Sequence, residues 1–369
     1  NMKQQIFVNT GEVSNTVVFS TDFTSKDIRL FEINDEILKS INSGDQIYIV
    51  GEKKQDAVFC TKNTTYSIKK VETSNTSLIV SPSSSSVFTI DGKFCNYYEL
   101  KRITGRIERI QEILKQTEYK GKLIEETYPP KNEELVTFSS LKNLVQASEA
   151  EIVTALATLN IVEMNGYIRL LPQSIYFEHA EALFDVIIEN GWRIDCINES
   201  LCMNSMSKDC DIVVLRRVLS SLGSSNETET SIWTLDRDKV LRLLAHVLFY
   251  IHVRDSSTNQ WPVEDFLTYW SIKSPISINF ESSADFLLRG IALKVTESTK
   301  VPYYHYLPVE QMSKQLSSRL QQLFSCSPQR QFRLEDLEPY LEGLVAVEQM
   351  QETLLTHCKF IDARYALKE

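Results

Sequence analysis

The sequence predicts an α+β protein, with a β-barrel-like domain over residues 1–102 and a helical region after it. Two patterns carry this prediction. Through the first hundred residues, short β-branched and aromatic segments alternate with clusters of Ser, Asn, Gly and Asp, as in barrels and sandwiches. From Phe138 onward, apolar residues recur every three or four positions, which is the period of a helix. The composition, 43% hydrophobic and 24% charged, is that of an ordinary globular protein.

The N-terminal domain is expected to contain eight short strands and one helix. The helix is expected over residues 34–41, with Asn34 as its N-cap and Gly44 beyond its end. The expected strands are 16–19, 28–33, 46–50, 57–60, 66–71, 77–80, 87–90 and 96–100.

The strand edges of this domain are the first candidate for function. An incomplete barrel accepts a partner's strand through main-chain hydrogen bonds. The candidate residues for facing a partner are Val17, Phe19, Ile47, Ile49 and Tyr97. A self-contained barrel would have the same sequence pattern, so both possibilities stay open here.

A helix and a linker are expected over residues 103–131. Ile103, Ile107, Ile110 and Leu114 recur at helical intervals, and charged residues fill the other face. Gly121 and two consecutive prolines then indicate a linker over residues 120–131.

Residues 132–219 are predicted to form a first helical module. Two apolar helical faces are followed by strands that flank Asn165-Gly166, the strongest two-residue hairpin signal. Two helices joined by a tight turn and followed by a hairpin make a winged helix. Residues 149–160 nevertheless contain two Glu and no Lys or Arg, and a phosphate-lined groove would repel such a helix.

The same order of elements predicts two more winged helices, over residues 220–305 and 306–369. A mobile loop or linker is expected over residues 220–231, which are polar. The other expected elements are helices at 236–253, 262–270, 284–293, 309–324, 334–344 and 348–360, and a strand at 303–306.

Charge restricts how the C-terminal part could contact nucleic acid. Residues 131–369 contain 22 Lys and Arg against 32 Asp and Glu, which accounts for the whole net charge of −10. Any nucleic-acid contact there must be local and sensitive to salt. Candidates for phosphate contacts without base readout are Arg330, Arg333, Lys359 and Arg364. The alternative is an ordinary solvated face.

The sequence does not predict an enzyme. It contains no phosphate-binding glycine loop and none of the common hydrolase or metalloprotease motifs. The seven Cys and five His are scattered, and carboxylate neighbours such as Glu125 and Glu126 lack a partner His. We therefore expect no cofactor, no metal and no catalytic residue. The absence of a long apolar run or a signal peptide predicts a soluble intracellular protein without membrane contact.

Three segments resemble a known family. They are NYYELKRITGRIERIQEIL (96–114), QWPVEDFLTYW (260–270) and YHYLPVEQMSKQLSSRLQQLFSCSPQRQFRLEDLEPYLEGL (304–344). Together they resemble the Dcc-type sister-chromatid-cohesion subunit of the alternative replication factor C clamp loader, the chromosome-transmission-fidelity form.

The resemblance implies a nuclear, non-enzymatic subunit of that clamp loader. It implies a barrel completed by the small and large loader subunits, followed by three winged helices. The first winged helix would dock the catalytic half of DNA polymerase epsilon, with Glu149, Glu151, Asn165 and Tyr167 as the candidate surface. The later two would bind single- or double-stranded DNA weakly and without sequence preference.

Two other functions are compatible with the residues. One is a winged-helix scaffold in transcription or ubiquitin ligation that binds only protein. The other is an enzyme with a carboxylate site assembled from scattered residues.

Overall fold

The structure is a computed structural model, and it describes residues 5–9, 14–20, 23, 28–53, 55–84, 87–226, 231–277, 283–296, 301–327 and 330–368. The chain forms two compact units. Unit 1 comprises Asn1–Tyr119 and Pro130–Leu171, and unit 2 comprises Lys120–Pro129 and Pro172–Glu369.

The N-terminal strands form an open sheet, so the alternative of a self-contained barrel is wrong for the described residues, and completion of the barrel by partner strands stays a prediction. Among the described residues, seven strands pair in the order β1-β2-β7-β6-β5-β4, and β3 also pairs with β7. No pairing joins β1 to β4, the two ends of the order. The strands are β1 (Gln5–Asn9), β2 (Ser14–Phe19), β3 (Phe31–Glu32), β4 (Tyr48–Val50), β5 (Val58–Cys60), β6 (Thr65–Ser84) and β7 (Val87–Ile103).

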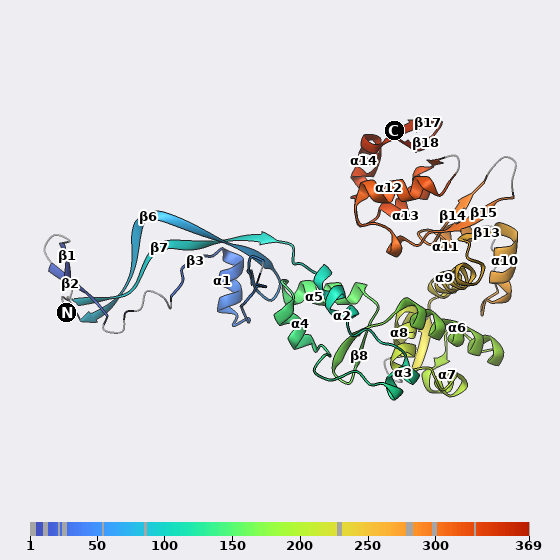
Figure 1. The fold of residues 1–369 in the computed structure, drawn as a ribbon, viewed down its shortest axis with the longest axis horizontal. Coiled ribbons are helices and arrows are strands. Elements are labelled where there is room, and N and C mark those ends of the chain that lie inside the picture. The colour runs from blue at the N-terminus through green and yellow to red at the C-terminus, as the bar shows by residue number, and fades with distance from the viewer. Residues whose placement is uncertain are drawn as a thin grey trace. The chain divides into compact units, whose positions relative to one another are not determined.

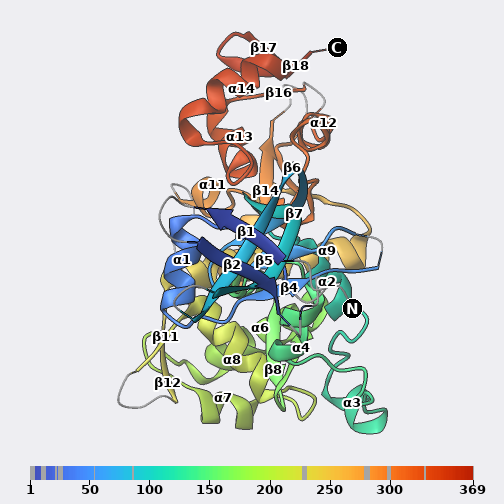
Figure 2. The same cartoon turned by 90° about the vertical axis from the view of Figure 1, so that its left-hand side faces the viewer.

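Strands β6 and β7 are long, and they form a ribbon where four short strands were expected (Figure 1). The polar run from Glu72 to Ser77 reads as a turn in the sequence, yet it remains in β6 because register shifts absorb the extra residues. Strands β1 and β2 lie at the far end of this ribbon, where Thr16–Phe19 of β2 pairs with β7 (Figures 1 and 2).

The near end of the sheet carries helix α1 (Asp35–Asn42), which confirms the predicted helix. The Asn34 side-chain oxygen accepts a hydrogen bond from the backbone N–H of Ile37 at 2.9 Å, as expected for an N-cap. Ile37, Phe59 and Tyr66 are buried together and form the core of this end.

The rest of the described chain repeats one order of elements four times, where three modules were predicted. Each repeat has a helix, a first strand, two helices, and then a second and a third strand. In every repeat the third strand pairs with both others, although in repeat 1 the first strand is reduced to a single bridge at Val136. The repeats span residues 108–170, 173–235, 237–306 and 316–367.

Repeat 1 belongs to unit 1 except for residues 120–129, which belong to unit 2 together with repeats 2, 3 and 4. Repeat 1 has α2 (Glu108–Lys115), α4 (Phe138–Leu144), α5 (Glu149–Thr158), β8 (Ile161–Met164) and β9 (Tyr167–Leu170). Repeat 2 has α6 (Gln173–Asn190), β10 (Ile197–Asn198), α7 (Glu199–Ser205), α8 (Ile212–Leu222), β11 (Gly223–Ser225) and β12 (Ile232–Leu235). Repeat 3 has α9 (Arg237–Ser256), β13 (Gln260–Pro262), α10 (Val263–Ile272), α11 (Ala284–Leu287), β14 (Ala292–Val295) and β15 (Tyr303–Tyr306). Repeat 4 has α12 (Leu316–Ser325), β16 (Gln331–Phe332), α13 (Leu334–Leu341), α14 (Met350–His357), β17 (Cys358–Ile361) and β18 (Arg364–Leu367).

The predicted first module, 132–219, begins within repeat 1 and ends within repeat 2, whereas repeat 3 ends beside the predicted boundary at residue 305 and repeat 4 lies within the predicted module 306–369. The boundary expected at residue 220 lies within α8, and the expected loop at 220–231 includes β11, while residues 227–230 of it lie outside the described residues. The expected linker carries the short helix α3 (Lys122–Thr127), and 3-10 turns occur at Val309–Gln311 and Val347–Gln349. The helices expected at 284–293 and 348–360 end at Leu287 and His357, and a strand follows each.

Repeats 3 and 4 share a hydrophobic core. In repeat 3, the ring of Phe249 stacks on that of Phe266 with centroids 4.3 Å apart. Leu293 of β14 is buried among residues of repeat 4, including Leu320, Leu337 and Tyr340. The relative position of these two repeats is therefore fixed by buried contacts.

Candidate interaction surfaces

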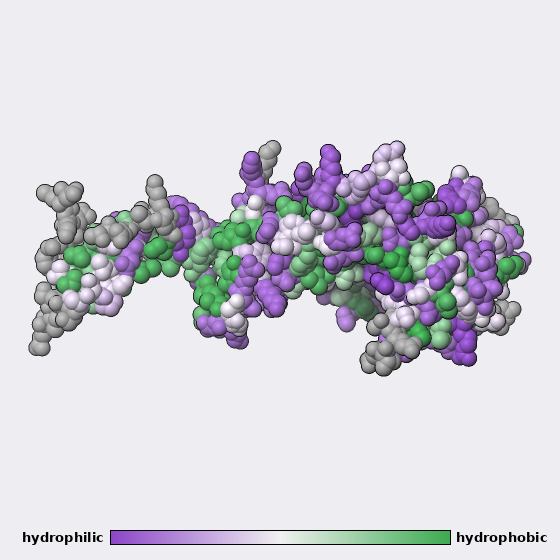
Figure 3. Space-filling view, turned by 90° about the horizontal axis from the view of Figure 1, so that it is seen from below, coloured by the Kyte–Doolittle hydropathy of each residue, from purple (hydrophilic) through white to green (hydrophobic). Residues whose placement is uncertain are grey.

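The β6–β7 ribbon exposes large apolar side chains. Leu78, Ile79 and Val80 are consecutive in β6 and are 40%, 43% and 45% exposed. Because successive side chains in a strand point to opposite faces, exposed apolar side chains lie on both faces of the ribbon at this point. Hydrophobic surface is visible along this part of the molecule at the left of Figure 3.

The five candidate partner residues lie at different depths. Ile49 is 54% exposed on β4, an end strand of the sheet among the described residues. Val17 on β2 is buried, and Ile47 packs against the core around Ile37. The ring of Phe19 contacts that of Phe23, and the Tyr97 hydroxyl donates to Glu99 at 3.2 Å.

Helix α1 has a second exposed apolar patch. Its residue Ile37 faces the core, whereas Leu38 and Ile41 are 44% and 45% exposed. Ile33, just before the helix, is 41% exposed. These residues were not among the predicted partner residues. A helix that packs on one side needs only one apolar stripe, so the additional apolar residues of this helix were a usable signal.

Glu151 does not lie on the outer face of α5, where the sequence analysis placed it. Its carboxylate accepts hydrogen bonds from the backbone N–H of Gly105 at 2.9 Å and from the Ser148 hydroxyl at 2.7 Å. It also accepts from the Thr65 hydroxyl of β6. The reason is local: Ser148 and Glu151 form a capping box, which turns the third helical residue back toward the helix start.

The hydrogen bonds of Glu151 also set its protonation. Burial alone would raise the pKa of this carboxyl, but the hydrogen bonds from Thr65, Ser148 and Gly105 outweigh burial and lower the pKa. Glu151 is therefore an ionised structural group that connects α5 to the sheet.

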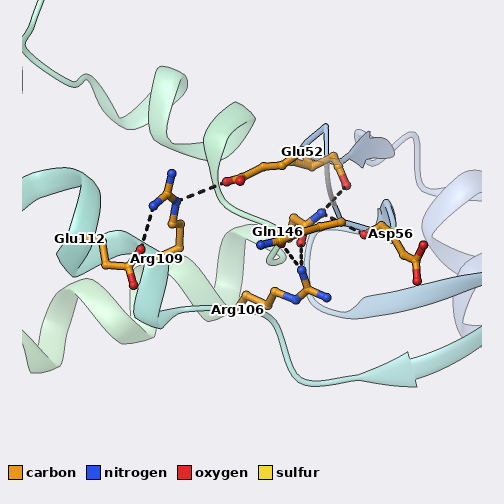
Figure 4. A network of polar contacts seen from close by, with 8 residues as sticks. Glu52, Asp56, Arg106, Arg109, Glu112 and Gln146 are labelled. Atoms are coloured by element: carbon orange, nitrogen blue, oxygen red, sulfur yellow. Dashed lines mark hydrogen bonds and ion pairs between the residues drawn. The ribbon is translucent and has the colours of Figure 1, made fainter.

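The turn between α4 and α5 makes further contacts with the sheet. The Gln146 amide donates to the backbone oxygen of Asp56 at 3.0 Å, and Arg106 donates to the Gln146 side-chain oxygen at 2.7 Å (Figure 4). The Tyr48 hydroxyl of β4 donates to the Ala147 oxygen at 3.1 Å. Arg109 of α2 pairs with Glu52 at 3.2 Å (Figure 4).

The other candidate docking residues remain accessible. Glu149 is partly exposed at the start of α5 and pairs with Lys142 at 2.8 Å. Asn165 is exposed, and Tyr167 is half-buried at the start of β9. Asn165 and Gly166 have positive φ angles of 54° and 80°, as a tight hairpin requires, so the hairpin prediction is confirmed.

The structure brings the candidate DNA-binding residues together on repeat 4. Lys359 of β17 lies opposite Ala366 of β18, and Arg364 lies two residues from Ala366 on the same strand face. Arg330 and Arg333 flank β16, whose Gln331 also lies opposite Ala366. We call this set of four cations the basic face.

Two cations near the basic face were missed by the sequence analysis. Lys294 of β14 and Arg289 belong to repeat 3, and both line a cleft that Arg333 and Arg364 also line. No sequence signal could have identified them, because their proximity depends on the shared core of repeats 3 and 4.

The described residues contain no cluster of three or more His, Cys, Asp or Glu arranged to hold a metal ion. No helix among them is both long enough and apolar enough to span a membrane.

Comparison with known proteins identifies the family. A profile described as Sister chromatid cohesion protein Dcc1 matches residues 28–341. The Sister chromatid cohesion protein DCC1 of Xenopus tropicalis is 26% identical over 368 residues, which cover 95% of this chain and 90% of that protein. The Homo sapiens protein of the same name is 24% identical over 344 residues, covering 89% and 84%. The Dictyostelium discoideum protein named Probable sister chromatid cohesion protein DCC1 is 24% identical over 379 residues, covering 95% of each.

These matches confirm the resemblance found in the three sequence segments, and the profile covers most of the chain. The chain belongs to the Dcc1 family of sister chromatid cohesion proteins.

Proposed function

We propose that this protein is a non-catalytic, nuclear subunit of an alternative clamp loader. It bridges the loader to DNA polymerase epsilon and to DNA, and so supports sliding-clamp loading or unloading and sister chromatid cohesion. Membership of the Dcc1 family supports the role in cohesion, since the relatives are named for it.

The observation that carries this proposal is the β6–β7 ribbon. Leu78 and Val80 share one face of β6 and Ile79 occupies the other, and all three are at least 40% exposed. Leaving such side chains in water costs about 25 cal/mol for each Å² of apolar surface. Strands from the small and large loader subunits would cover both faces and complete a shared barrel.

The repeats supply the other contacts in this proposal. We assign the repeats the winged-helix fold because each repeat has the order of helices and strands, and the strand pairing, of a winged helix. Repeat 1 docks the polymerase through Glu149, Asn165 and Tyr167. The basic face of repeat 4 contacts DNA phosphates without reading bases. Each contact raises the effective concentration of the next, so weak contacts together hold the loader at a fork.

Co-expression of the full chain with the candidate partner segments of both loader subunits tests the proposal. We expect a stoichiometric complex by size-exclusion chromatography with light scattering. We also expect slower amide hydrogen exchange in β6 when the partners are present, because their strands pair with the ribbon.

Paired variants test whether the ribbon is the binding surface. Leu78→Ser with Val80→Ser should abolish the complex. Leu123→Ser changes a side chain that is 61% exposed on α3, outside the β domain, and should leave the complex intact. A stable monomer that ignores both partners would contradict the proposal and favour a scaffold that binds other proteins.

A further inference from the structure

A polar cleft lies between repeats 3 and 4 of unit 2. Its larger part, of about 380 Å³, is lined by side chains that include Arg289, Lys294, Arg333 and Arg364. A smaller adjoining part, of about 110 Å³, shares Lys294, Arg333 and Arg364 with it. We call the two parts together the inter-repeat cleft.

The walls of the inter-repeat cleft are held in place. Arg289 of repeat 3 pairs with Glu338 of repeat 4 at 3.1 Å, beside the shared core. On the repeat 3 side, Lys294 pairs with Asp285 at 3.0 Å, and the Tyr304 hydroxyl donates to Asp285 at 2.7 Å. Arg289 and Lys294 are therefore held in position before a ligand binds, which reduces the entropy lost on binding.

The charges favour an anion of limited length. The smaller part of the cleft is lined by three cations, Lys294, Arg333 and Arg364, against one carboxylate, Asp336, so it is locally positive in the half of the chain that carries the net charge of −10. The larger part adds the carboxylates Asp285 and Glu335, and Glu338 pairs with its Arg289. Arg333, Asp336 and Arg364 line both parts of the cleft. Burial raises the pKa of Asp336, while the backbone N–H of Arg333 and the charges of Arg333 and Arg364 oppose this shift. The carboxylates would repel a continuous run of phosphates passing through the cleft.

We propose that the inter-repeat cleft binds the terminal phosphate of a nucleic-acid strand, through Lys294 of repeat 3 and Arg333 and Arg364 of repeat 4. A terminal phosphomonoester carries more charge than an internal phosphodiester and has a phosphate neighbour on one side only. Guanidinium groups bind its oxygens in a bidentate manner. This inference rests on the proposed DNA contact of repeat 4 and names the part of the DNA that the site prefers.

Fluorescence anisotropy tests this with the full chain and a short single-stranded oligonucleotide labelled at its 3′ end. The oligonucleotide is used with a 5′-phosphate and with a 5′-hydroxyl. We expect the 5′-phosphate to increase affinity about tenfold, as one charge-assisted contact does. Lys294→Gln should remove this difference and leave affinity for the 5′-hydroxyl strand within about twofold, while Lys294→Arg should restore it.

The controls separate this inference from the proposed function. Lys314→Gln changes an exposed lysine that does not line the cleft and should keep the preference. Equal binding of both oligonucleotides by the unmodified chain would overturn the cleft assignment and leave the DNA contact standing. Binding of neither would overturn both. Equally tight binding of a phosphoserine peptide would assign the cleft to phosphorylated protein instead.

Discussion

At the scale of single residues, the two glutamates at the start of α5 have different roles. Glu149 is partly exposed and pairs with Lys142, whereas Glu151 accepts hydrogen bonds from the sheet and from its own helix cap. The motif Ser148-x-x-Glu151 was visible in the sequence as a capping box. The contacts with Thr65 and Gly105 were not, because they join residues far apart in the chain.

Glu151→Ala should therefore destabilise unit 1. The substitution leaves the Gly105 N–H without its acceptor, whereas the Ser148 N–H keeps the Thr65 hydroxyl as a second acceptor. One hydrogen bond to a charged group contributes about 1.5–3 kcal/mol. We expect a loss of about 2 kcal/mol in the free energy of unfolding, measured by urea denaturation. Glu149→Lys is the matched control and should cost less than about 1 kcal/mol, since it disrupts one partly exposed ion pair.

Glu149→Lys also tests polymerase docking. It reverses the charge of a surface residue with little effect on folding, so weaker polymerase binding would result from the lost contact of Glu149 with the polymerase. An unchanged free energy of unfolding for Glu151→Ala would contradict the structural role assigned to that carboxylate.

At the scale of elements, the sequence predicted the helix and the hairpin that are determined by residues close together in the chain. Helix α1 follows from the Asn34 cap, and the β8–β9 hairpin follows from Asn165-Gly166. The ribbon was missed because its bulges pass through a polar run that resembles a turn. Repeat 2 was missed as a separate module because its boundaries depend on the pairing of β10 with β12, which come from distant segments.

The hairpin turn of repeat 1 was predicted from the sequence, whereas the hairpin turn of repeat 4 was not. Asn165 and Gly166 have φ angles of 54° and 80°, and Asp362 and Ala363 have φ angles of 49° and 60°. Both turns need positive φ at two consecutive residues, which Ala adopts only at a cost of about 1–2 kcal/mol. Because Ala does not indicate a turn, the turn after β17 was not predicted, and the predicted helix extended to residue 360.

Ala363→Gly should therefore stabilise repeat 4. Removing the side chain relieves the strain of the left-handed conformation, and the greater freedom of Gly in the unfolded chain offsets part of the gain. We expect a net increase of roughly 0.5–1 kcal/mol in the free energy of unfolding, measured by chemical denaturation. The reciprocal change, Gly166→Ala at the matching position of the β8–β9 turn, should have the opposite sign. A destabilised Ala363→Gly variant would show that the turn is not strained.

At the scale of the whole molecule, the two units differ in their response to pH. All five histidines lie in unit 2, and unit 1 has none. Burial lowers the pKa of His179, His246 and His305. For His246 the effect is largest: burial and then the nearby Arg242 lower its pKa from 6.5 to about 4. Its ring packs between those of Phe177 and Tyr306, and its Nε2 has no hydrogen-bond partner.

Unit 2 should therefore lose stability as the pH falls from 7 to 5, while unit 1 changes little. A histidine whose pKa is lower in the folded state contributes stability that is complete above the unfolded value of 6.5 and decreases as the pH falls toward about 4. His246 alone should account for about 2 kcal/mol between pH 7 and pH 5. Amide hydrogen exchange, corrected for its intrinsic pH dependence, should show the loss in α9 but not in α5. His246→Phe keeps an aromatic ring beside Phe177 and removes the titrating group, so it should reduce the loss in α9. Equal losses in α5 and α9, or no effect of His246→Phe, would show that the buried imidazoles do not control the acid response.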